Sequence, residues 1–109
     1  MEQTFVIVYR PGPAWLAGLP LSAQPLEAHV DYMQELKQAG QVRLAGPYAD
    51  ETGGLVVLRT MTESQAQNVL SHDPAIINQI LAAELHPWTL MIDVDETEEG
   101  NDVQGELIL

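Results

Sequence analysis

Cysteine is absent from this chain of 109 residues, which excludes disulfides and thiolate catalysis. The chain also lacks an apolar run near the roughly 18 residues that a membrane span needs. Its first residues lack the basic and apolar regions of a signal peptide. We therefore expect a soluble, cytoplasmic protein.

Positive charge is scarce as well, since four Lys and Arg stand against sixteen Asp and Glu, for a net charge of −12. This balance repels a nucleic-acid backbone and an anionic membrane surface, so we expect neither as a partner. Seven of the sixteen acids lie between Asp93 and Glu106, and no base lies among them. We expect one folded domain over residues 1–94 and an acidic C-terminal extension over 95–109.

Apolar patterning and turn signals divide the first 94 residues into strands and helices. Strands are expected at 4–10, 41–45, 55–61 and 85–94, and helices at 26–40, 62–70 and 74–83. This order predicts an α+β, ferredoxin-like βαββαβ protomer. Right-handed crossovers place both main helices on one sheet face, yet three of the strands are apolar on both faces. We therefore expect a homodimer, or a higher oligomer, that covers the other face as a dimeric α+β barrel.

The segment 26–40 has the period of an amphipathic helix. Pro25 suits its first position, and Gly40 suits a left-handed cap. The stripe predicted to face the core consists of Leu26, Val30, Met33 and Leu36. His29 lies at the edge of this stripe, where a histidine is either a packing residue or a catalytic residue.

The segment 11–24 contains three prolines and two glycines and is a long loop. Trp15, Leu16 and Leu19 argue for an ordered loop because their side chains need burial. A lid over a pocket and a packed surface loop both fit this composition.

Several short motifs occur along the chain in a characteristic order. They are His29 within a helix, Ala45-Gly46-Pro47, Gly53-Gly54 before a strand, Asp73-Pro74, and Pro87-Trp88 in the last strand. Together they resemble the YCII-related (YciI-like) family over roughly residues 4–93, and Pro13-Ala14-Trp15-Leu16 is similar to a subgroup with a tryptophan-bearing loop.

This resemblance implies a dimeric α+β barrel and an active site built on His29 and Asp73. One characterised relative eliminates chloride from a chlorinated hydroxyhydroquinone, and similar barrels include muconolactone isomerase-like and monooxygenase-like enzymes.

A carboxylate bonded to one imidazole nitrogen fixes the tautomer and makes the other nitrogen a better base. Asp73 and His29 would form such a pair if they meet. The competing interpretation is a packed His29 and an Asp73 that only caps a helix. If both helices start at the same end of the sheet, the pair should miss by several ångströms.

The other candidate residues concern the substrate. Arg10 is a candidate anchor for an anionic group, and the remaining candidates for substrate contact are Tyr9, Trp15, Pro47 and Trp88. His72 and His86 suit surface positions, and no HxH or HExxH spacing predicts a metal site. No phosphate loop or Rossmann glycine motif predicts a cofactor.

Two hypotheses follow. The first is a small cofactor-free enzyme that performs acid–base elimination or isomerisation on a small cyclic or phenolic molecule, with His29 as base. The second is a non-catalytic module that binds a small ligand or a partner on the same dimeric scaffold.

Overall fold

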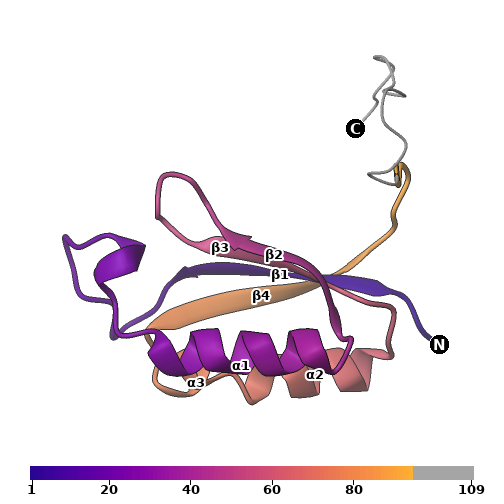
Figure 1. Cartoon of the computed structure of the whole chain (residues 1–109), viewed down its shortest axis with the longest axis horizontal. Coiled ribbons are helices and arrows are strands. Elements are labelled where there is room, and N and C mark those ends of the chain that lie inside the picture. The colour runs from indigo at the N-terminus through magenta and orange to yellow at the C-terminus, as the bar shows by residue number, and fades with distance from the viewer. Residues whose placement is uncertain (95–109) are drawn as a thin grey trace.

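A four-stranded antiparallel sheet carries all the helices on one face in the computed structural model, which describes residues 1–94 (Figure 1). The strands are β1 (Thr4–Pro11), β2 (Val42–Pro47), β3 (Gly54–Leu58) and β4 (Leu81–Trp88), in the spatial order β2-β3-β1-β4. The helices are α1 (Glu27–Gln38), α2 (Glu63–Ser71) and the short α3 (Pro74–Ile77), with a 3₁₀ turn, η1 (Leu21–Ala23), before α1. The predicted α+β, ferredoxin-like order of elements is therefore confirmed, and the expected extension 95–109 lies outside the described residues.

Alternation along β1 gives the sheet two different faces. Phe5, Ile7 and Tyr9 point toward the helices and are at most 4% exposed. The cross-strand register places Val6 and Val8 opposite Val57 and Leu55, on the face without helices. This second face is called the open face below, and within the described residues no element covers it.

Local signals account for the boundaries of α1 and α2. Thr62 and Gln65 form the predicted capping box at the start of α2. Gly40 has a φ of 74° after α1, so the predicted left-handed cap is confirmed. Pro25 is not a first helical residue, because Leu26 is the N-cap and α1 begins at Glu27.

The second half of the chain departs from the prediction at α3. This helix ends at Ile77 rather than at Ala83, and β4 begins at Leu81 rather than Leu85. The cause is a left-handed turn at Gln79, with a φ of 63°, where helices usually use glycine. As a result Pro87 lies near the end of β4 and not near its start.

The stripe on α1 is only partly buried, contrary to the prediction. Leu36 belongs to the core, and Leu26 and Met33 are half-buried against it. Val30 is 53% exposed. The reason is that a groove lies between this face of the helix and the strands β2 and β3.

Candidate functional site

The topology of the sheet brings the ends of two helices together. Because β1 and β3 are antiparallel, α1 and α2, which follow them, begin at opposite ends of the sheet. Residues after α2 therefore lie beside the start of α1, as Figure 1 shows for α3. The expectation that both helices start at the same end, and that His29 and Asp73 miss each other, is wrong.

His29 and Asp73 are in direct contact. His29 Nδ1 lies 2.8 Å from Asp73 Oδ1 and 2.9 Å from Oδ2. The Asp73 side chain is fully buried, whereas 16% of the His29 side chain is exposed. The pair therefore joins a buried carboxylate to an imidazole that reaches the surface of the groove.

Two further donors hold the Asp73 carboxylate. The Tyr9 hydroxyl donates to Oδ2 at 2.8 Å, and the Ala75 backbone N–H donates to Oδ1 at 2.9 Å. Burial, together with the charge and hydrogen bond of Asp73, raises the pKa of Tyr9, so the phenol keeps its proton and acts as the donor. With an acceptor-only carboxylate opposite it, the His29 tautomer is assigned as Nδ1–H.

The other imidazole nitrogen, Nε2, has no hydrogen-bond partner within residues 1–94, and His29 lines the groove. The ring also packs edge-on against Tyr9, with 5.5 Å between the centroids and 75° between the planes. Three contacts, from Asp73, from Tyr9 and from α1 itself, therefore fix the ring. An unprotonated nitrogen in a fixed ring is the arrangement of a general base.

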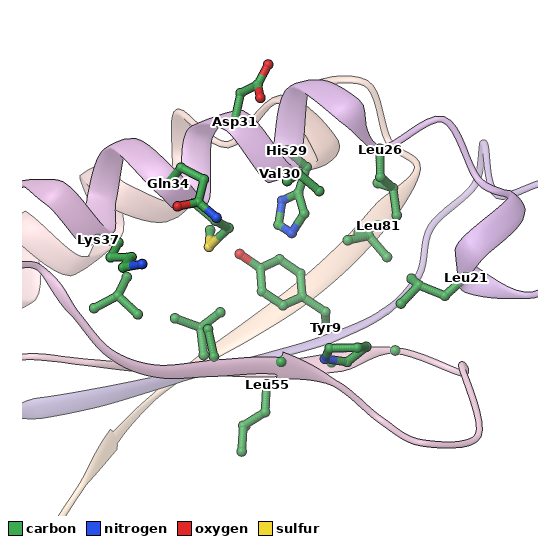
Figure 2. A pocket seen from close by; sticks show the side chains of 18 of the residues that line it. Tyr9, Leu21, Leu26, His29, Val30, Asp31, Gln34, Lys37, Leu55 and Leu81 are labelled. Carbon is green, nitrogen blue, oxygen red and sulfur yellow. The ribbon is translucent and has the colours of Figure 1, made fainter.

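The groove has a volume of about 1260 Å³ and lies between α1 and the sheet (Figure 2). One wall is the α1 face that carries Leu26, Val30 and Met33. The opposite wall is the helix-side face of β2 and β3, including Ala45 and Val56. The site thus combines apolar walls with one imidazole, which suits a small organic ligand.

The long loop closes one end of the groove. Its organising residue is Gln24, 6% exposed, whose amide bonds the backbone of Leu16 and Leu19. The side chain of Glu51, between β2 and β3, accepts a hydrogen bond from the backbone N–H of Ser22. Gln24 therefore holds the loop together and Glu51 ties it to the β2–β3 connection, while Leu16 and Leu19 remain 45% exposed.

The predicted substrate residues lie in different places. Tyr9 and Pro47 line the groove. Trp15 is half-buried and packs against the core under the long loop. Arg10 is on the open face, with Nη1 3.5 Å from Glu84, and Trp88 pairs with Thr4 at the far end of β1 from Tyr9. Roles in substrate binding for these residues stay predictions.

The two remaining histidines are exposed, and neither side chain bonds His29 or Asp73, although His72 directly precedes Asp73. His72 caps α2, with Nδ1 2.8 Å from the Asn68 carbonyl, and His86 Nε2 lies 3.0 Å from Glu84. Within residues 1–94, no three His, Asp or Glu side chains gather in a metal-binding arrangement. No helix in this part of the chain is long and apolar enough to cross a membrane.

Sequence reasoning missed one contributor to the site. Tyr9 was expected to touch the substrate, but its hydroxyl is engaged by Asp73. Its backbone carbonyl also lies so close to Gly53 that a Cβ there would be 2.2 Å away. The Gly53-Gly54 pair at the start of β3 was the signal of this close approach.

The fold and the site define a class: a small ferredoxin-like α+β protein with a histidine–aspartate pair at a groove beside the first helix. The YCII-related domain family matches residues 4–89, and the chain belongs to this family. A search of curated proteins finds no match.

A solved structure with a similar fold is that of 5-chloro-2-hydroxyhydroquinone dehydrochlorinase from Burkholderia phenoliruptrix AC1100, in complex with 2,5-dihydroxybenzoquinone. The TM-score is 0.61 at 18% identity, covering 80% of this chain and 94% of that one. At this identity the likeness concerns the fold.

Proposed function

We propose that this chain is a small acid–base enzyme that takes a proton from a small cyclic or phenolic organic molecule and drives an elimination or an isomerisation. The observation that carries the proposal is the His29–Asp73 contact at the wall of an apolar groove. The dehydrochlorinase activity of a protein with a similar fold supports the same reaction class.

His29 Nε2 would accept the proton from an acidic C–H or O–H of the substrate. The electron pair of that bond would form a new double bond and expel a leaving group with its own pair, or return to carbon at another position. Asp73 would stabilise the imidazolium that forms and hold Nδ1–H in place. In an elimination, the Nε2 proton would pass to the leaving group or to water. In an isomerisation, it would pass to the carbon that receives the electron pair. Either transfer restores the neutral ring.

The test is chloride release from 5-chloro-2-hydroxyhydroquinone and related chlorinated hydroquinones. We expect turnover by the wild type and a loss of about 10²-fold or more in His29→Gln, because general bases contribute this much. His86→Gln is the matched control, since His86 is exposed and lies outside the groove. Equal turnover by His29→Gln would refute the role of His29, and ligand binding without turnover or solvent proton exchange would favour the non-catalytic module.

We also propose that the protein forms a homodimer through the open face. Leu44 and Leu55 are 61% and 38% exposed there, beside Val6 and Val8. Burial of this exposed apolar surface in a dimer would stabilise the dimer by about 25 cal/mol for each Å² removed from water. In Figure 2 Leu55 points away from the groove, so such a dimer leaves the groove walls in place.

Light scattering after size exclusion measures the mass in solution. We expect a dimer for the wild type and a monomer for Leu44→Glu, because the substitution would bury a carboxylate in the interface. Ile77→Glu is the control, since Ile77 on α3 is also 61% exposed but lies on the helical side. A monomeric wild type contradicts the dimer.

A further inference from the structure

The Tyr9 hydroxyl and the His29 ring share one carboxylate. Tyr9 donates to Asp73 Oδ2 at 2.8 Å, and His29 Nδ1 lies 2.8 Å from Oδ1 and 2.9 Å from Oδ2. The two donors come from different elements, since Tyr9 lies on β1 and His29 on α1. Both depend on the negative charge of the same buried group, so a change in one hydrogen bond alters the other.

Bulk water contributes little to the stability of this carboxylate. The Asp73 side chain is fully buried, and Tyr9 is 4% exposed. A buried carboxylate is stabilised by the donors that the protein supplies, which here are the Tyr9 hydroxyl, the Ala75 N–H and the His29 ring. Loss of the Tyr9 hydroxyl therefore increases the share of this stabilisation that His29 must supply.

Within residues 1–94, no other ionisable side chain bonds His29 or Asp73. The Tyr32 hydroxyl donates to a carbonyl of α2 at 2.7 Å, and His72 is bonded to the end of the same helix. Charged side chains on α1 and beside the long loop also border the groove; they are Glu27, Asp31, Lys37 and Glu51. Those on α1 are exposed, and solvent screens their charges. Tyr9 is therefore the titratable group that acts most directly on the carboxylate beside His29.

The hydrogen bond from Tyr9 opposes protonation of the pair. A second proton on the His29 ring is favoured by the negative charge of Asp73, which faces Nδ1–H. The hydrogen of the Tyr9 hydroxyl, with its partial positive charge, points at the same carboxylate. It offsets part of the charge that would stabilise the imidazolium, so it lowers the affinity of the pair for its proton.

We propose that Tyr9 is a positioning residue that acts through Asp73: its hydroxyl limits the hold of the carboxylate on the protonated His29 ring, so that this ring can both take up and release a proton. This inference rests on the proposed function, because only a general base has to release the proton that it accepts. A base that binds its proton too tightly is already protonated before the substrate arrives. The Tyr9 hydroxyl is engaged by Asp73, so it acts on the pair rather than on the substrate.

Tyr9→Phe removes the hydroxyl and keeps the ring that packs edge-on against His29. The experiment follows the imidazole nitrogens of the full chain by ¹⁵N NMR over a series of pH values. A hydrogen bond to a charged group corresponds to about a tenfold change in affinity, so we expect the pair to take up its proton about one pH unit higher in Tyr9→Phe than in the wild type. The titration midpoints of His72 and His86 should not change, since neither side chain bonds the pair.

Tyr32→Phe is the matched control. Tyr32 is also a partly buried phenol, on the same helix as His29, but its hydroxyl donates to the Val69 carbonyl. Its removal should lower stability without changing the midpoint of the pair. An equal shift in Tyr32→Phe would show that the midpoint responds to any loosening of the core, and would overturn the role of Tyr9. An unchanged or lower midpoint in Tyr9→Phe would overturn it as well.

A second substitution tests the same hydrogen bond without removing it, in case Tyr9→Phe fails to fold. Incorporation of 3-fluorotyrosine at residue 9 preserves the hydroxyl and makes it a stronger donor. The midpoint of the pair should then move in the opposite direction, to lower pH. A midpoint that stays or moves to higher pH would contradict the inference.

Turnover separates this inference from the proposed function. In chloride release, Tyr9→Phe should move the acidic limb of the pH profile for kcat to higher pH by the same interval. KM should stay nearly unchanged, because the hydroxyl does not contact the substrate. A shifted midpoint together with an inactive wild type contradicts the proposed function alone, whereas turnover with an unshifted midpoint contradicts the role of Tyr9 alone.

Discussion

Replacement of Asp73 by asparagine should change the protonation of His29 while nearly preserving shape. In the native site three donors converge on the carboxylate: Tyr9 O–H, Ala75 N–H and His29 Nδ1–H. An amide has one acceptor oxygen and two N–H donors. If the oxygen keeps the Ala75 N–H, the amide nitrogen faces Tyr9 and His29.

The site can relax in one way. The Tyr9 hydroxyl rotates to accept from the amide, and His29 shifts its proton to Nε2 so that Nδ1 accepts. The nitrogen that faces the groove then carries a proton and cannot act as a base. Asp73→Asn should therefore abolish acid–base activity, although the size and position of every side chain in the site stay nearly the same.

The energetic cost follows from the hydrogen bonds whose charged acceptor, the carboxylate, is replaced by a neutral amide. A hydrogen bond to a charged group contributes about 1.5–3 kcal/mol and a neutral one about 1 kcal/mol. All three bonds change from a charged to a neutral partner, so at about 1 kcal/mol each we expect a loss of about 3 kcal/mol in the free energy of unfolding. For a domain of this size that corresponds to about 12–24 °C in Tm.

The assays are thermal unfolding and the ¹⁵N NMR spectrum of the imidazole nitrogens. We expect an Nδ1–H signature for His29 in the wild type and Nε2–H in Asp73→Asn, with the signals of His72 and His86 unchanged. Asp31→Asn is the control, because Asp31 is exposed on the same helix and should stay within about 0.5 kcal/mol of the wild type. Wild-type stability together with an unchanged His29 tautomer in Asp73→Asn would refute the reasoning.

Two further perturbations test the surroundings of the pair. Burial and Asp73 raise the pKa of Tyr9, so its stabilising contribution is present below pH 10 and is lost at higher pH, by about 1.4 kcal/mol per pH unit. In urea unfolding measured at a series of pH values, Tyr9→Phe should therefore show a smaller alkaline fall in the free energy of unfolding. The fall that remains is expected from Tyr32, whose pKa burial also raises. An equally steep fall in the variant would contradict this. Gly53→Ala should cost more than about 2 kcal/mol, because the new Cβ would meet the Tyr9 carbonyl at 2.2 Å, whereas Gly46→Ala has open space and should cost little. Equal urea midpoints for the two alanine variants would contradict this, because they would show that the backbone moves to accommodate the Cβ at residue 53.

The sequence predicts those elements whose signals are local. Thr62 and Gln65 announce α2 because both halves of the capping box lie within one turn. The end of α3 carries no such signal. A glycine at residue 79 would have predicted the left-handed turn, but Gln79 adopts this conformation instead. Tertiary packing imposes that turn, and it moves the start of β4 by four residues.

Helical periodicity on α1 identifies an apolar face but does not say what covers it. Leu26, Val30 and Met33 satisfy the pattern of a core-facing stripe, yet they line a groove. The distinction depends on what packs against this face in the fold, which no residue within the helix determines.

The two interpretations of Asp73, as a helix cap and as the partner of a histidine, were alternatives in the sequence and are both satisfied in the structure. A carboxylate has two oxygens and about four acceptor positions. Oδ1 accepts from the Ala75 N–H, which caps α3, while both oxygens face His29 Nδ1 and Oδ2 accepts from Tyr9. The cap fixes the side-chain rotamer, so the break between α2 and α3 is what aims the carboxylate at α1. An N-cap explanation therefore does not weaken the case for the pair, because the cap is the device that preorganises it.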